Sequence, residues 1–453
     1  AALNPLSLVY MNRPASAGAT YTPTRFDDPA PDGCQPADCS LREAIIAANE
    51  NPGNDTVTLT AGQYEVNLMT SFHGEPVTAA LSIIDSTTVI GQGADRTTLQ
   101  GYGVGGVFTI QHPTFAPISV HIADLAIHDG LRDGGGGAVY AASGVSLNIT
   151  RVTMTGNGGG GGSGGAILSN YGIVTITDST IANNWAQFGG GISANRLTIT
   201  NSTVSGNRAM IDTAGIGSGN ATLTNVTVTG NSTPYNSLGL GGVAGAGTIV
   251  NSIIAGNTGR QCSGLTSLGH NLYGDNSCGS GPGDIVSTDP MLGPLADNGG
   301  PTQTHALLAD SPAIDAGDNN ACPSADQRGY GRVGACDIGA YEYAPPPTPP
   351  PTPKPIVVAA SPTPAPTAAP ESPTPTPKPS PSPTAKSSPS PTPRHSQTPS
   401  PSPTSSGDEE GGGGGLIIGL ALGGLAVAGA SGGGGYYLWR RSVAGLRLWP
   451  PWT

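Results

Sequence analysis

Apolar residues alternate with threonine in an eleven-residue segment that recurs at intervals of about 25 residues along the middle of the chain. Five copies align without gaps and an earlier, degenerate copy precedes them: 120–130, 147–157, 174–184, 197–207, 221–231 and 247–257. Alternation of apolar and polar residues with a period of two is typical of a β-strand. A single copy cannot bury its apolar face alone, so the repeat predicts copies that stack on one another.

Four columns of the aligned copies indicate how the stack is built. Two columns are aliphatic: Ile122, Ile149, Ile176, Ile199, Leu223 and Ile249, and then Ile127, Met154, Ile181, Val204, Val228 and Ile254. Two columns are polar or glycine: Asp124, Arg151, Asp178, Asn201, Asn225 and Asn251, and then Gly130, Asn157, Asn184, Asn207, Asn231 and Asn257. Asparagine and glycine tolerate left-handed backbone angles, which sharp turns between strands need. Stacked asparagines can also form a hydrogen-bonded ladder.

These columns predict an all-β fold, a right-handed parallel β-helix like that of pectate lyases. Strands of successive coils would pair at a spacing of about 4.8 Å. Glycine-containing segments between the copies, such as 189–192 and 214–216, are expected to add further strands. Leucine-rich repeats are the alternative. They need several leucines and a helix per repeat, whereas threonine, asparagine and glycine dominate here.

A helix is expected to cover the N-terminal end of the solenoid. Ser40 and Glu43 have the spacing of a capping box, in which each side chain satisfies the backbone amide of the other residue. The helix predicted at 41–48 has Leu41, Ala44, Ile45 and Ala48 on one face, which can lie over the first coil.

The last quarter of the chain has the composition of a stalk and a membrane anchor. Proline, serine and threonine dominate residues 344–406, and proline prevents helix and sheet, so a disordered stalk is predicted at 344–415. The apolar run 416–438 is long enough to cross a bilayer as one helix. Acidic residues precede this run and paired arginines follow it, which predicts a cytoplasmic tail at 439–453. We therefore expect a single-pass cell-surface protein whose N-terminal region is extracellular.

The region before the stalk divides into three parts. Residues 1–19 end in small residues, as before a signal-peptidase site, and are expected to be a signal remnant or a disordered start. Residues 20–284 are predicted to form the β-helix with its N-terminal cap, and 285–343 a C-terminal capping region.

Charge and cysteine content narrow the possible functions of this exported part. Before Ala344 the chain has 11 arginines, no lysine and 26 acidic residues, so nucleic acid is not expected as a partner. All six cysteines lie there and form three local pairs, Cys34 with Cys39, Cys262 with Cys278 and Cys322 with Cys336. An even number of cysteines outside the membrane favours disulfides, although six cysteines allow many pairings. Zinc is the alternative, but no C-x-x-C spacing or nearby histidine pair supports it.

Several motifs resemble a known family of bacterial surface proteins. The segment 39–45, Cys-Ser-Leu-Arg-Glu-Ala-Ile, resembles the N-terminal signature of CSLREA-type proteins, and later segments are similar to the choice-of-anchor Q domain: 297–307, 311–317, 326–329 and 337–342. The resemblance covers roughly residues 20–343. It implies a right-handed β-helix held at the cell surface by a C-terminal anchor, and it implies no catalytic residues.

Candidate catalytic and metal-binding groups are few. Asp124 and Asp178 lie two coils apart with Arg151 between them, which would separate the carboxyls by about 10 Å, near the range of inverting glycosidases. A solvated turn with an ion pair is the simpler interpretation. His128 and Asp129 could form a general-base pair, but adjacent strand residues point to opposite faces. Calcium could bind four aspartates of the C-terminal region, whose simpler role is to stabilise loops: Asp315, Asp318, Asp326 and Asp337.

Aromatic residues between coils suggest a binding surface. Trp185 and Phe188 lie in one inter-coil loop and Tyr235 in another, where they could stack on sugars or pack within their loops. The sequence therefore predicts a membrane-anchored surface protein with a structural, adhesive or glycan-binding role, and with surface glycans or other cells as partners. An extracellular polysaccharide lyase or glycoside hydrolase is the alternative, although we expect no catalytic site, metal or cofactor.

Overall fold

The computed structural model describes residues 17–72, 75–103, 105–236 and 239–344. The predicted stalk, membrane segment and cytoplasmic tail lie outside these ranges, as does most of the predicted signal remnant. In the ranges that are described, no helix is long and apolar enough to cross a membrane.

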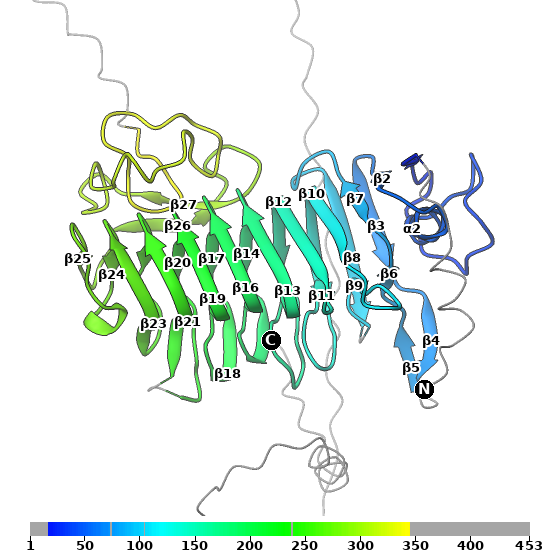
Figure 1. The fold of residues 1–453 in the computed structure, drawn as a ribbon, viewed down its shortest axis with the longest axis horizontal. Helices are drawn as coiled ribbons and strands as arrows, with labels where there is room; N and C mark the ends of the chain where they lie inside the picture. The colour runs from blue at the N-terminus through cyan, green and yellow to red at the C-terminus, as the bar shows by residue number, and fades with distance from the viewer. Residues whose placement is uncertain (1–16, 73–74, 104, 237–238, 345–453) are drawn as a thin grey trace, which may run out of the picture. The chain divides into compact units, whose positions relative to one another are not determined.

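The described chain winds into an all-β parallel solenoid with three faces (Figure 1). Strands stack from one coil to the next, and the strand pairings that build the three faces are parallel. This is the stacked arrangement that the repeat predicts. Connections between parallel strands are almost always right-handed, which agrees with the hand predicted for the helix.

Several long strands bend at a corner, so that their first and second parts belong to different faces. Face 1 contains β1 (Thr20–Tyr21), β2 (Asp55–Thr58), β7 (Thr87–Ile90), the first parts of β10 (Ile118–Gly130) and β12 (Val145–Thr155), and the second parts of β13 (Ile167–Thr177), β16 (Ile192–Thr200), β19 (Ile216–Thr224), β21 (Leu240–Val250) and β23 (Arg260–Gly269). Face 2 contains β3 (Gly62–Val66), β8 (Thr97–Gly103), the second parts of β10 and β12, β14 (Thr180–Ala182), β17 (Thr203–Ser205), β20 (Thr227–Thr229), β22 (Ile253–Ile254), β24 (Leu272–Tyr273) and β25 (Ile285–Val286).

Face 3 closes each coil. It contains β6 (Leu81–Ile83), β9 (Phe108–Ile110), β11 (Val139–Ala141) and the first parts of β13, β16, β19, β21 and β23. Three small sheets lie outside the faces: β15 (Trp185–Phe188) with β18 (Arg208–Asp212), β4 (Met69–Phe72) with β5 (Glu75–Thr78), and β26 (Leu292–Ala296) with β27 (Thr304–Leu307). Most of the glycine-containing segments between the repeats thus lead into strands of face 3, as predicted.

The two aliphatic columns form the centre of the core. All twelve of their side chains, from Ile122 to Ile254, are fully buried. On face 1 the alternate residues of the same strands, such as Thr198 beside Ile199, point outward and are partly exposed. The apolar alternation in the sequence therefore separates inside from outside correctly.

The corner between face 1 and face 2 is a single residue in the left-handed conformation. It is the third column of the repeat, from Asp124 (φ 56°) to Asn251 (φ 50°), and His270 (φ 55°) continues it into the last coil. Asparagine and aspartate adopt these angles at less cost than other non-glycine residues, because their short side chains bond locally.

The fourth column behaves differently from the expectation that its asparagines supply left-handed turns. The residue before each asparagine has the positive φ instead, as at Gly156, Asn183 and Gly206. The asparagines are buried and stack: Asn207 Oδ1 accepts hydrogen bonds from the backbone N and from Nδ2 of Asn184, both at 3.0 Å. The same pattern runs from Asn157 to Asn257, where Gln261 Oε1 ends the ladder. The ladder asparagines do not have positive φ, and the left-handed residue stands one position earlier.

The N-terminal end is covered by the helix α2 (Leu41–Glu50), two residues longer than predicted (Figure 1). Ser40 and Glu43 form the predicted capping box. Leu41, Ala44, Ile45 and Ala48 are buried against the first coils. The disulfide Cys34–Cys39 closes the loop that leads into the helix, and the other predicted pairs, Cys262–Cys278 and Cys322–Cys336, are also bonded.

Residues 290–344, which we call the lateral segment, correct the expectation of a C-terminal cap. β25 still continues the last coil, but the lateral segment returns along the outside of face 2, above β17 and β20 in Figure 1. Thr203 Oγ1 donates to Gln327 Oε1 at 2.7 Å, and the backbone N of Ala340 donates to Thr227 Oγ1 at 3.1 Å. The segment thus covers the side of the solenoid from the coil of Asp178 onward.

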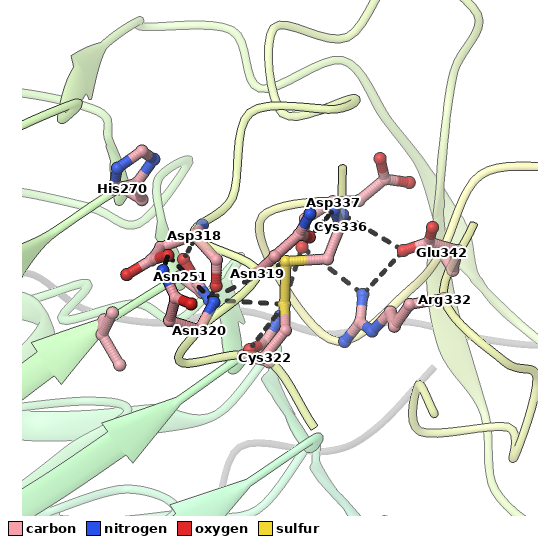
Figure 2. The surroundings of a disulfide bond; sticks show 12 residues. Asn251, His270, Asp318, Asn319, Asn320, Cys322, Arg332, Cys336, Asp337 and Glu342 are labelled. Carbon is pink, nitrogen blue, oxygen red and sulfur yellow. Dashed lines mark hydrogen bonds and ion pairs between the residues drawn. A yellow bond between two sulfur atoms is a disulfide. The ribbon is translucent and has the colours of Figure 1, made fainter. Parts of the chain in front are cut away.

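Figure 2 shows one anchor of the lateral segment, the Cys322–Cys336 disulfide between Asn251 of the solenoid and the Arg332–Glu342 ion pair. The side-chain amide of Asn251 donates to the backbone oxygen of Asp318 at 3.0 Å and accepts from its backbone N at 2.8 Å. The corner column therefore has a second use, because its polar side chains hold the lateral segment.

Candidate functional site

Solvent-exposed apolar side chains gather where the chain passes from face 2 to face 3. We call this surface the ledge and define it by Trp185 and Phe188 of β15, Arg208, Met210 and Ile211 of β18, and Tyr235. β18 lies at the edge of the solenoid opposite β26 and β27 (Figure 1). Tyr235 is 72% exposed and Trp185 is 40% exposed. Scattered exposed hydrophobic residues are common, but neighbouring ones on a surface mark a binding site.

The residues at one position of the repeat, directly after the fourth column, pair with one another along the ledge. These residues pair from coil to coil as Leu131, Gly158, Trp185, Arg208 and Ser232. Because the ladder fixes the backbone just before them, their side chains leave the solenoid at the same place in every coil.

Trp185 lies against the backbone of Gly158 in the preceding coil. A Cβ atom at Gly158 would come within 2.6 Å of the indole atoms Cε2 and Cζ2, so the contact requires glycine there. The backbone of Gly158 supports the indole from below while a large part of the ring surface stays open to solvent. This support fixes the ring before any ligand arrives, which lowers the entropy cost of binding.

Arg208 links the next two coils of the ledge. Its backbone pairs with Trp185, and its guanidinium carbon lies 5.5 Å from the ring centre of Tyr235. Arg208 Nη2 also donates to the hydroxyl of Tyr235 at 3.3 Å. The structure therefore brings Trp185 and Tyr235 to one surface with a cation between them. Phe188, on the same strand as Trp185, pairs with Asp212 of β18.

The acidic corner residues form an ion pair rather than two opposed free carboxyls. Both oxygens of Asp124 accept hydrogen bonds from Arg151 at 2.6 Å. Burial raises the pKa of Asp178 to about 6, although a hydrogen bond from Asn201 and the charge of Arg151 act in the other direction. The backbone oxygen of Asp178 accepts from Thr302 Oγ1 of the lateral segment at 2.9 Å. Asp124 and Arg151 are thus paired with each other, and the backbone of Asp178 is hydrogen-bonded to the lateral segment.

His128 and Asp129 interact with different partners. His128 Nδ1 lies 2.5 Å from Thr155 Oγ1, whereas Asp129 Oδ2 accepts from Gln100 Nε2 at 3.0 Å. Burial lowers the pKa of His128, so its imidazole is mostly neutral at pH 7. These contacts tie neighbouring coils together on face 2.

The aspartates considered as calcium ligands accept hydrogen bonds from loop amides. Asp326 Oδ1 accepts from the backbone N of Arg328 and Tyr330, and Asp337 accepts from the backbone N of Asp315 and Tyr343. Among the residues that the structure describes, no three or more acidic, histidine or cysteine side chains come together as a metal site.

Sequence reasoning missed the cation and the aliphatic part of the ledge. Arg208, Met210 and Ile211 are exposed on β18, next to the strand that presents Trp185. Trp185 and Arg208 each follow a ladder asparagine in the sequence. Alignment of this position across the copies would have predicted that the two side chains leave neighbouring coils at the same place.

No protein-family model matches the chain, and no curated protein matches it. Among solved structures the chain is similar to the crystal structure of pectate lyase Pel9A, with 13% sequence identity and a TM-score of 0.35 over 73% of this chain and 98% of that chain. A likeness at this level carries no argument about activity.

Proposed function

We propose that the protein is a cell-surface β-solenoid that binds glycans through the ledge. The observation that carries the proposal is that Trp185, Arg208 and Tyr235 come from successive coils, lie next to one another and are exposed to solvent. Aromatic rings present broad apolar faces on which the C–H faces of sugar rings stack. A guanidinium beside them offers several donors to sugar hydroxyls or carboxylates.

The shape of the ledge favours a chain of sugars over a single small molecule. Trp185 and Tyr235 belong to coils two apart, a separation of about 10 Å along the solenoid axis. That distance suits two sugars of an extended oligosaccharide that are separated by one further sugar. The open surface also fits a polymer that continues past both ends of the site, whereas small ligands are usually enclosed in pockets.

The proposal places this site outside the cell. The acidic exported region, three disulfides and the apolar run 416–438 support export and anchoring by a C-terminal membrane helix. The motifs shared with CSLREA-type and choice-of-anchor Q proteins support the same location. The long Pro/Ser/Thr tract then serves as a spacer that carries the solenoid away from the membrane.

A glycan array probed with the full-length protein tests the proposal. We expect binding to oligosaccharides of three or more sugars, and we expect Trp185→Ala to weaken it at least about ten-fold because one stacking platform is lost. Tyr171→Ala is the matched control, since Tyr171 is an exposed aromatic residue outside the ledge. Absence of binding across neutral and acidic glycans, or equal losses in the two variants, contradicts the proposal.

A polysaccharide-cleaving enzyme is the second candidate, and one observation favours it. Burial raises the pKa of Asp178 to about 6, whereas Asp124 is held in an ion pair with Arg151, and a glycosidase needs two carboxyls whose environments differ. A depolymerisation screen on acidic and neutral polysaccharides tests this candidate. Products that disappear with Asp178→Asn support it, and the absence of products from the wild-type protein excludes it for those substrates.

A further inference from the structure

Face 1 carries two outward columns of threonine that the ledge and the lateral segment do not use. The first column is Thr175, Thr198, Thr222, Thr248 and Thr266, and the second is Thr150, Thr177, Thr200 and Thr224. Each of these threonines is partly or fully exposed, and over the coils of Thr175, Thr198 and Thr222 the residues between the two columns, Ile176, Ile199 and Leu223, are buried.

The columns form a two-dimensional lattice. Over the three coils that contain Thr175, Thr198 and Thr222, the strands of face 1 stay in register without a bulge. Threonines of neighbouring coils are therefore about 4.8 Å apart, and the two threonines of one strand are about 6.7 Å apart. β-branched side chains have restricted χ1 angles, so hydroxyl and methyl groups repeat with the same spacing.

The hydroxyls of this lattice face solvent. In the part of the chain that the structure describes, Thr150 is the one member with a side-chain hydrogen bond, to His121 Nε2 at 3.2 Å. The outward threonines of face 2 differ, because the hydroxyls of Thr180, Thr203 and Thr227 all bond to the lateral segment. Face 1 and face 2 thus both carry outward threonines. The lateral segment covers those of face 2, and no part of the described chain bonds to the hydroxyls of the two face 1 columns apart from that of Thr150.

We propose that the threonine lattice of face 1 binds ice. A ligand that binds a fixed lattice tightly must itself be rigid and periodic, because a flexible ligand would lose conformational entropy when it is ordered on the surface. The prism face of hexagonal ice has a repeat of similar dimensions. The methyl groups order water into cages between the columns, and the hydroxyls hold that water in place, so the bound layer can merge with the crystal. The two columns themselves consist of uncharged side chains over these coils. The exposed Arg196, two residues before Thr198 on the same strand, marks the edge of this uncharged area.

Inhibition of ice recrystallisation by the full-length protein in detergent, with detergent alone as the blank, tests the inference. We expect inhibition at micromolar concentration. Thr198→Tyr places a ring above the plane of the lattice and should raise the required concentration at least about ten-fold. Ser193→Tyr is the control, because Ser193 points outward on face 3 from the same strand, β16, and should leave inhibition unchanged.

Circular dichroism confirms that each variant keeps its strands, and Thr222→Lys serves in place of Thr198→Tyr if that variant is unfolded. Thr222 is exposed, so a lysine there extends into solvent while it breaks the lattice. Wild-type protein that leaves ice growth unchanged overturns the proposal, as do equal losses on face 1 and face 3. Binding to crystalline cellulose through face 1 without any effect on ice also overturns it, since the ligand would then be a polysaccharide crystal.

Discussion

Asparagine has two roles in this solenoid, and its position in the repeat decides which one applies. At the corner, Asn201, Asn225 and Asn251 have positive φ and turn their side chains toward the lateral segment. In the ladder, Asn184 and Asn207 do not have positive φ and bond to the coils on either side. A buried amide that lost these partners would cost about 1–3 kcal/mol for each unsatisfied group. The ladder therefore specifies the stacking of coils as well as stabilising it.

Exchange of neighbouring residues for aspartate tests the inside–outside pattern at the scale of one residue. Ile199→Asp buries an unpaired carboxyl in a fully enclosed column, which we expect to cost several kcal/mol. Thr198→Asp places the same group in solvent and should change the free energy of unfolding by less than about 1 kcal/mol. Urea denaturation of both variants and the wild type measures the difference. Equal losses would show that the two side chains do not lie on opposite sides of the strand.

Single residues also show the limit of what the sequence could predict. The aliphatic columns were predictable because burial imposes the same alternation on every coil. The exact position of the second turn was not, because both Asn183 and Asn184 tolerate left-handed angles and only the stacking shows that Asn184 belongs to the ladder. Arg208 was missed for a related reason, since its place beside Tyr235 depends on a pairing between coils.

The lateral segment is the element that the sequence describes least well. It has no periodic apolar pattern. It binds the solenoid through single hydrogen bonds between residues far apart in the chain, such as Thr203 with Gln327, and through a small apolar cluster in which Leu307 and Ile338 pack near Ile253. Position after the last repeat suggested a cap, whereas the bonds place the segment along face 2. Contacts of this kind leave no local signal, so only the folded structure reveals them.

Two buried carboxyls should make the attachment of the lateral segment sensitive to pH. Burial raises the pKa of Asp178 and of Asp337 to about 6, above the value of about 3.9 in an unfolded chain. For an acid with a raised pKa the folded state binds more protons, so its contribution to stability is complete below pH 4 and is lost as the pH rises through 6. Arg151, Asp326 and Asn201 act on Asp178, and Glu342 and Asp315 act on Asp337.

Comparison with Asp337→Asn isolates this effect from other titrations. Burial lowers the pKa of His305, which sits between β17 and β26, so this histidine destabilises the fold as the pH falls and opposes the aspartates. The variant keeps His305 but has no carboxyl at 337. We expect the thermal midpoint of the wild type, relative to Asp337→Asn, to be higher at pH 4.5 than at pH 7.5. A difference that is constant or grows with pH would show that Asp337 does not have a raised pKa in the folded protein.

At the scale of the whole molecule, the solenoid gives its surfaces different roles. Face 2 is covered by the lateral segment, face 1 presents a threonine lattice, and the ledge presents aromatic rings beside a cation. The sequence predicted the stacked architecture and three members of the ledge, because repeats and exposed aromatics are visible in one dimension. It could not show that these aromatics share a surface, because that depends on which coils are adjacent.

Fluorescence of Trp185 tests the central claim, that the ledge binds glycans, most directly. Three other tryptophans lie near the C-terminus, and exchange of Trp439, Trp449 and Trp452 for phenylalanine leaves Trp185 as the single tryptophan in the full-length protein. Titration with the oligosaccharide that binds best on the glycan array should shift or quench the emission of Trp185. The change should saturate at the same concentration as binding measured by calorimetry, because stacking of a sugar replaces water on the indole. Calorimetric binding that leaves the emission and iodide quenching of Trp185 unchanged would contradict the claim.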